Sequence, residues 1–164
     1  PELLEGINAL YKATMHRTAE SVSPGLLYMV GNASSLAAGC MYCMAHSGGA
    51  AAHSGEDAEK VAAIWEFETS PLFSEAERAA LRFAQAASSV PNMATDADFE
   101  ALREHFSDYQ IVELLSIICL YGFFNRWNDT LATPLEAGPK AFAEKTIGDK
   151  GWTAGKHAAG DAAE

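Results

Sequence analysis

Apolar side chains recur at intervals of three and four residues along almost the whole chain, and this spacing constrains the fold more than any other feature. It is the spacing of one face of an α-helix. The N-terminal segment is an example, with apolar residues at Leu3, Leu4, Ile7, Leu10, Tyr11 and Met15. No stretch alternates strictly between apolar and polar residues, as a half-buried β-strand would. The sequence therefore predicts an all-α protein.

Helix-capping signals divide this pattern into successive helices. Ser23-Pro24 is typical of an N-cap followed by proline at the first helical position. Residues 74–77 and 107–110 have the spacing of capping boxes. The expected helices after the N-terminal one cover residues 24–37, 40–53 and 108–131, with further helix starts near 54–57, 74 and 95–98. Gly48 and Gly49 weaken the second of these, because each glycine costs roughly 1 kcal/mol relative to alanine.

The length and composition predict one domain. A chain of 164 residues, of which 49% are hydrophobic, can bury a substantial core. We expect a single-domain helical bundle over residues 1–147. The segment 148–164 is rich in Gly, Ala, Lys and Asp. We expect it to be a loosely ordered C-terminal tail or to lie on a neighbouring subunit.

The charge argues against two classes of partner. Acidic residues outnumber basic ones by 22 to 11, which gives a formal net charge of −11. Nucleic acids and anionic membrane surfaces repel such a protein, so we expect neither as a partner. The N-terminus is acidic where a secretory signal would be basic. We therefore expect a cytoplasmic protein.

The longest apolar run, Leu114–Phe124, has only 11 residues. A transmembrane helix needs about 20, so no membrane span is predicted. The run is nevertheless too apolar to leave one side exposed, which predicts a homo-oligomer. Cys119 lies inside it and is expected to be a buried small residue.

Two segments of the chain have matching spacing, which hints at two related helical halves packed together. In each segment, one residue precedes a polar X-x-x-X turn by twelve positions: Tyr28 before Cys40 and Cys43, and Glu113 before Asn125 and Asn128. Apart from this spacing the two segments share little identity.

Cys40, Cys43 and His46 are the strongest candidates for chemistry. Residues three apart lie roughly 60° apart on one helix face, so Cys43 would lie between the other thiol and the imidazole. Two thiols one turn apart can form a disulfide with little backbone movement. A thiol has a pKa of about 8.5 and reacts as the thiolate, which a helix N-terminus and a nearby histidine favour. The spacing therefore supplies a nucleophile, a second thiol and a base.

Two other interpretations of this segment stay open. A zinc site could be formed by Cys40, Cys43, His46 and His53. Seven helical residues span about 10 Å between the histidines, so the helix would have to break at Gly48-Gly49. Alternatively, the cysteines are two small buried residues beside a surface histidine.

The segment 40–47, Cys-Met-Tyr-Cys-Met-Ala-His-Ser, resembles the C-x-Y-C-x-A-H-S/T signature of one branch of the alkylhydroperoxidase/carboxymuconolactone decarboxylase family. Further similar runs lie at residues 70–78, 111–114, 125–129 and 151–157. The resemblance extends from about residue 20 to 157. It implies an all-helical fold, homo-oligomers and, in members with C-x-x-C, a dithiol that reduces peroxides.

The sequence departs from the family's best-described proton relay at two positions. That relay has a glutamate twelve residues before the first cysteine, where this chain has Tyr28, and a histidine four residues after the second, where His46 follows by three. If the two halves pack about a pseudo-twofold axis, Glu113 could face the dithiol from the other side. Glu113, Tyr28 and His53 are therefore the candidates to complete the relay.

These observations favour a thiol-dependent peroxidase that needs no cofactor or metal. Cys43 would attack a hydroperoxide, Cys40 would close the disulfide, and His46 would accept and donate the protons. An external thiol or dithiol would then reduce the disulfide. The alternatives are a lactone decarboxylase of the same family and a non-catalytic zinc-bound or redox-sensing module.

Overall fold

The computed structural model describes residues 1–158, and these residues form helices without any β-strand. The α-helices are α1 (Glu2–Thr14), α2 (Pro24–Ala38), α3 (Met41–His53), α4 (Ala58–Ala62), α5 (Glu75–Ser88), α6 (Asp96–Arg103), α7 (Asp108–Leu131) and α8 (Ala137–Ile147). Three 3₁₀ helices are also present: η1 (Ala63–Glu66), η2 (Gly148–Lys150) and η3 (Gly155–His157). The prediction of an all-α, single-domain fold is confirmed.

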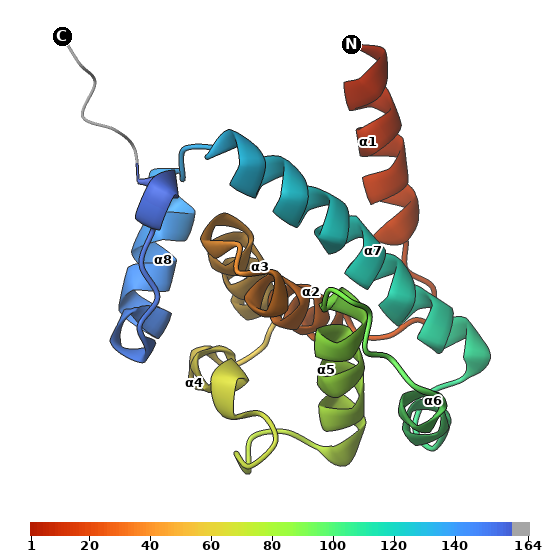
Figure 1. Ribbon diagram of the computed structural model, residues 1–164. Helices are drawn as coiled ribbons and strands as arrows, with labels where there is room; N and C mark the ends of the chain where they lie inside the picture. Colours follow the sequence, from red (N-terminus) through yellow and green to blue (C-terminus); the bar gives the residue numbers. More distant parts are fainter. Residues whose placement is uncertain (159–164) are drawn as a thin grey trace, which may run out of the picture.

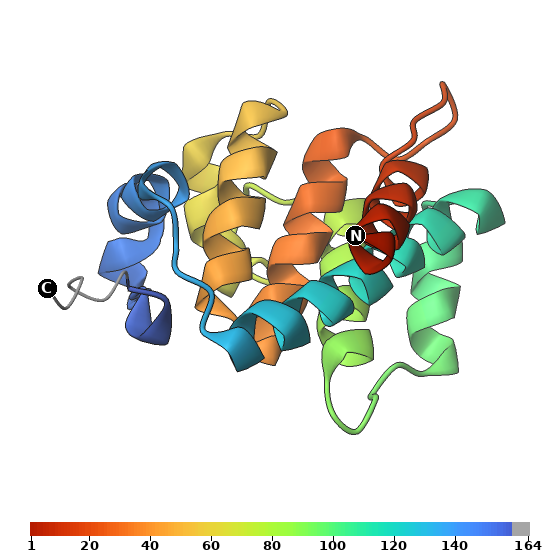
Figure 2. The same ribbon diagram turned by 90° about the horizontal axis from the view of Figure 1, so that it is seen from above.

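Helix α2 is packed among α3, α5 and α7, and α7 crosses over both α2 and α3 (Figure 1, Figure 2). Fully buried apolar residues of these helices form the main core, among them Leu27, Met29, Val30, Leu81, Phe83, Leu114 and Ile117. Burial of each such side chain contributes about 1.5–3 kcal/mol. Gly31 permits the close approach of α2 and α7, because a Cβ there would collide with the ring of Tyr121. The core therefore holds α2, α5 and α7 in one arrangement.

The capping signals mark true helix starts. Ser74 and Ser107 form capping boxes with Glu77 and Gln110 at the starts of α5 and α7. The side chain of Ser23 accepts a hydrogen bond from the third residue of α2. These predictions are confirmed. The sequence could predict the caps because capping depends on residues only a few positions apart.

Helix α3 runs through Gly48 and Gly49 without a break. A Cβ on Gly48 would lie 3.3 Å from atoms of Asn32, Val61 and Phe142, which belong to α2, α4 and α8. Close packing therefore explains a glycine at this position despite its low helix propensity.

The segment that follows Gly148 differs from the expected loose tail. Trp152 is only 3% exposed, and its indole N–H donates to the carbonyl of Met41 over 3.1 Å. The carbonyl of His157 accepts a hydrogen bond from the N–H of Leu135. Residues 148–158 are therefore packed against the start of α3, because two large side chains are buried within an otherwise small and polar stretch. Residues 159–164 of the expected tail lie outside the described residues.

Helix α1 projects from the bundle and contacts α7 (Figure 1). Several large apolar side chains of these two helices are exposed, among them Leu3, Leu4, Leu10, Val112, Trp127 and Leu131. The homo-oligomer expected from the sequence stays a prediction, and these residues are the surface it would cover. Within residues 1–158, no helix combines the length and apolarity needed to cross a membrane.

Candidate active site

The junction between α2 and α3 places the two cysteines. Gly39 ends α2 in the left-handed conformation, with a φ of 72°, and Cys40 follows as the N-cap of α3. The backbone N–H of Cys43 donates to the sulfur of Cys40 over 3.5 Å. Both thiols are buried, with exposures of 0% and 3%. The first turn of α3 thus brings the predicted pair together.

The pKa values of the two thiols are shifted in opposite directions. The pKa of Cys40 is lowered, because its sulfur accepts hydrogen bonds from the thiol of Cys43 and from backbone N–H groups, which outweigh its burial. The pKa of Cys43 is raised by its hydrogen bond to Cys40 and by burial. The first proton lost from the pair therefore leaves the negative charge on Cys40.

Cys43 is the thiol that faces a cavity. The cavity has a volume of about 440 Å³ and lies between α1, α3 and α7. Aromatic rings line much of it, namely those of Tyr11, Tyr28, Tyr42, Tyr121, Phe123, Phe124 and Trp127. Cys40 is not among its lining residues. A substrate in this cavity would meet the sulfur of Cys43, with Cys40 behind it.

Asn128 on α7 contacts the reactive pair and was missed by the sequence reasoning. Its side-chain amide donates to the sulfur of Cys43 over 3.8 Å. The matching spacing in the two segments was the available signal, because Asn128 occupies the place in the second segment that Cys43 occupies in the first. The two segments therefore meet at the site, and whether they are related halves stays a prediction.

His46 lies at the rim of the same cavity, paired with Glu136. Its Nε2 is 2.8 Å from a carboxylate oxygen of Glu136, and the hydroxyl of Tyr42 donates to the other oxygen over 3.0 Å. Burial favours the protonated carboxyl, but hydrogen bonds from backbone N–H, His46 and Tyr42 leave the pKa of Glu136 lowered. Burial and the bond to Glu136 raise the pKa of Tyr42 to about 12.

The role of His46 as a base for Cys43 stays a prediction. Among residues 1–158, no hydrogen bond joins this imidazole to either thiol. Glu136, its actual partner, was missed because it lies ninety positions away in the sequence. It is the N-cap of α8, a helix that no motif pointed to.

Glu113 does not face the dithiol, so this expectation is wrong. Its carboxylate pairs with Arg17 over 2.8 Å and accepts a hydrogen bond from the N–H of Val22 over 2.9 Å. Asn128, which does reach Cys43, lies fifteen residues further along α7. That separation is about 22 Å along a helix. Glu113 instead fixes the connection between α1 and α2 to the start of α7.

Replacing Glu113 by Ala is expected to lower the free energy of unfolding by about 3 kcal/mol, because it leaves the Arg17 guanidinium and a buried N–H without partners. Urea unfolding followed by circular dichroism measures this change. Glu104→Ala, at an exposed carboxylate, is the matched control and should change stability by less than about 0.5 kcal/mol. If Glu113→Ala left the stability unchanged but abolished the reaction of the thiols, Glu113 would have a role in the chemistry.

Tyr28 and His53, the other candidates for the relay, are placed differently. Tyr28 lines the cavity of Cys43, where its hydroxyl is 3.5 Å from that of Tyr11, and burial and this contact raise its pKa to about 12. His53 lines a neighbouring cavity that contains no cysteine. Because α3 is unbroken, His53 is about 10 Å along the helix axis from His46. The four-residue zinc site that required a break is therefore wrong.

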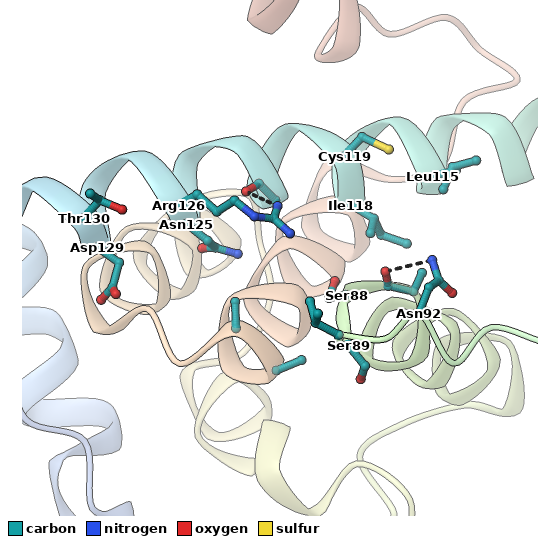
Figure 3. Close-up of a pocket in the computed structure, with 15 residues that line it drawn as sticks. Ser88, Ser89, Asn92, Leu115, Ile118, Cys119, Asn125, Arg126, Asp129 and Thr130 are labelled. Carbon is teal, nitrogen blue, oxygen red and sulfur yellow. Dashed lines mark hydrogen bonds between the residues drawn. The ribbon is translucent and has the colours of Figure 1, made fainter.

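Cys119 is exposed, whereas the sequence predicted a buried thiol. It lies on the side of α7 that borders a cavity of about 850 Å³, together with Asn125, Arg126 and Asp129 (Figure 3). Cys119 was expected to be buried because the run around it is apolar, but within this single chain α7 is packed on only some of its sides.

The model of the carboxymuconolactone decarboxylase family matches residues 1–86, which include Cys40, Cys43 and His46. The uncharacterized Escherichia coli (strain K12) protein YnjA is 32% identical over 97 residues, which are 59% of this chain and 53% of YnjA. The chain thus spans about half the length of this curated relative.

Solved structures share the fold. The debrominase Bmp8 is 36% identical with a TM-score of 0.78, over 89% of this chain and 77% of Bmp8. A cysteine-to-alanine variant of Bmp8 has been solved with 2,3,4-tribromopyrrole. An Agrobacterium tumefaciens protein of unknown function, with a suggested antioxidant defence role, is 25% identical with a TM-score of 0.76, over 84% and 92% of the two chains. An uncharacterized peroxidase-related protein from Ralstonia eutropha is 26% identical with a TM-score of 0.70, over 79% and 68%.

Proposed function

This chain belongs to the carboxymuconolactone decarboxylase family, and on this premise we propose that it is a thiol-dependent peroxidase that reduces hydroperoxides through a Cys40/Cys43 dithiol–disulfide cycle. One observation carries the proposal. Cys43 opens onto a cavity large enough for a small organic molecule, while Cys40 lies behind it at a helix N-terminus with a lowered pKa. A nucleophile and the thiol that resolves it are thus already adjacent.

In the first step, the sulfur of Cys43 attacks the terminal oxygen of the hydroperoxide. The O–O bond breaks, Cys43 becomes a sulfenic acid, and its thiol proton passes to the Cys40 thiolate. His46, oriented by Glu136, donates a proton to the departing alkoxide, which leaves as the alcohol. The opposite pKa shifts support this direction, because Cys40 is the ionised thiol of the pair and its sulfur can take up the proton that Cys43 loses as the S–O bond forms.

In the second step, the sulfur of Cys40 attacks the sulfenic sulfur of Cys43. The disulfide forms, the S–O bond breaks, and hydroxide leaves with the Cys40 proton as water. The two thiols have lost two electrons, and the peroxide has gained them. An external thiol or dithiol then reduces the disulfide by exchange.

The cavity wall indicates the substrate class. Seven aromatic rings and few charged groups favour an apolar organic hydroperoxide over hydrogen peroxide. The suggested antioxidant role of the Agrobacterium tumefaciens protein supports the same chemistry at 25% identity.

A second candidate function is the reductive removal of halogen from an aromatic ring. It is favoured by the aromatic cavity and by the 36% identity to the debrominase Bmp8. The sulfur of Cys43 would attack the halogen, the ring carbon would take a proton, and Cys40 would displace halide to form the disulfide. The same pair of thiols would supply the two electrons.

Peroxide titration with intact-mass measurement tests the proposal. In a Cys119→Ser background, which removes the exposed thiol, one equivalent of cumene hydroperoxide should consume both remaining thiols and lower the mass by two hydrogen atoms. The Cys40→Ser/Cys43→Ser variant in the same background is the control and should not react.

Other outcomes separate the alternatives. No disulfide with cumene hydroperoxide, but disulfide and bromide formed with 2,3,4-tribromopyrrole, would favour dehalogenation. A lactone decarboxylase needs no dithiol, so full decarboxylase activity in the double variant would overturn the proposal. Zinc-bound and redox-sensing modules would show no catalytic turnover with an added dithiol.

A further inference from the structure

A second group of polar side chains lies next to Cys40, outside the aromatic cavity. The Cys40 sulfur, a carboxylate oxygen of Asp129 and a ring nitrogen of His157 all lie within 4.8 Å of one another. They come from the N-cap of α3, the last turn of α7 and η3. None of the three lines the cavity that Cys43 faces.

His157 is held in a state that can bind a cation. It is 1% exposed, and its Nδ1 is 2.9 Å from the carbonyl oxygen of Thr133. A carbonyl only accepts hydrogen bonds, so Nδ1 carries a proton, and in the neutral ring Nε2 is the nitrogen that presents a lone pair. This Nε2 is buried, and within residues 1–158 it has no hydrogen-bond partner. Metal-binding histidines commonly donate their second N–H to a backbone carbonyl in this way.

The other two groups complete a donor set for zinc. Asp129 directs Oδ1 toward His157 Nε2, at 3.5 Å, while its Oδ2 pairs with Lys156 at 2.8 Å. Ligands of a tetrahedral zinc lie about 2.0–2.3 Å from the ion and therefore roughly 3.5 Å from each other. A thiolate and a carboxylate together balance the charge of Zn²⁺, and sulfur, nitrogen and oxygen are its usual ligand atoms.

The group has a route to solvent. The side chain of Asp129 is 37% exposed, and Asp129 also lines the 850 Å³ cavity on the other side of α7. Figure 3 shows Asp129 at one end of that cavity, beyond Asn125 and Arg126. An ion can therefore reach the two buried donors past the carboxylate.

We propose that Cys40, Asp129 and His157 bind one Zn²⁺ ion in the reduced protein, with a water molecule as the fourth ligand. One consequence rests on the proposed function, in which Cys40 and Cys43 form a disulfide. The sulfur of Cys40 cannot bind zinc as a thiolate and form the disulfide at the same time. Zinc therefore protects the dithiol from oxidation, and oxidation releases zinc.

Zinc titration of reduced, metal-free Cys119→Ser protein against a chromogenic chelator tests the site without peroxide. We expect one equivalent of Zn²⁺ to bind, and His157→Asn and Asp129→Asn each to weaken binding by at least about 100-fold. His53→Asn is the matched control and should bind zinc unchanged, because His53 belongs to the cavity beyond His46. Protein oxidised to the disulfide with diamide should bind no zinc.

Cobalt substitution keeps the test decisive if a buried variant fails to fold. Co²⁺ bound to the Cys119→Ser protein should show a thiolate-to-metal charge-transfer band, which Cys40→Ser should abolish. Absence of stoichiometric binding, or binding that survives Cys40→Ser or His157→Asn, would overturn the site. Because no peroxide is used, a failed zinc titration leaves the peroxidase proposal standing, and a failed peroxide titration leaves the zinc site standing.

Discussion

Replacing Cys43 by Ser is expected to slow hydroperoxide consumption by at least about 10³-fold, since it removes the attacking sulfur. Cys40→Ser should instead consume one equivalent of hydroperoxide and stop with a sulfenic acid on Cys43. The reason is geometric. Cys43 lines the aromatic cavity, whereas Cys40 is fully buried and does not line it.

Sulfenic-acid trapping followed by peptide mass spectrometry measures this difference on the two single variants. Both should be made in the Cys119→Ser background, because the exposed third thiol could also be labelled. Label on Cys40 in the Cys43→Ser protein, with none on Cys43 in the other variant, would reverse the assignment. In that case the lowered pKa of Cys40, and not access to the cavity, would decide which thiol attacks.

Replacing His46 by Asn is expected to slow the chemical step by roughly 10²–10⁴-fold, because it removes the group at the cavity rim that transfers protons. Glu136→Gln should have a smaller effect, since the amide can still accept a hydrogen bond from the imidazole but no longer carries charge. Stopped-flow mixing of reduced protein with cumene hydroperoxide measures the step before the external reductant contributes.

His53→Asn is the control for this series, because His53 lies on the same helix but not in the cavity of Cys43. It should react at the rate of the unaltered protein. If His46→Asn were equally fast, solvent would be the proton donor, and the contact between His46 and Glu136 would serve only to join α3 to α8.

The predictions that held depend on residues close together in the chain. Helix periodicity, the capping boxes at Ser74 and Ser107 and the adjacency of Cys40 and Cys43 need only neighbours within about one turn. A prediction that placed two distant segments in contact was wrong. Glu113 was assigned to the dithiol by its spacing, but its partners are Arg17 and the backbone of Val22.

In two segments, the composition did not predict which side chains are exposed. Cys119 lies in an apolar run and yet is exposed, because one side of α7 is not packed in the bundle. Trp152 and His157 lie in a small and polar stretch and yet are buried against the start of α3. Composition averages over a segment, whereas burial is decided by which single side chains find a partner surface.

The sequence by itself determined an all-α chain with a dithiol in the first turn of one helix, because both features follow from local spacing. Only the tertiary structure decided the surroundings of that dithiol. The packing of α7 across α3 brings Asn128 to Cys43, the start of α8 brings Glu136 to His46, and the C-terminal segment brings His157 beside Cys40. These contacts join residues 85 or more positions apart, and they depend on how whole helices bury their apolar faces, which no short motif encodes.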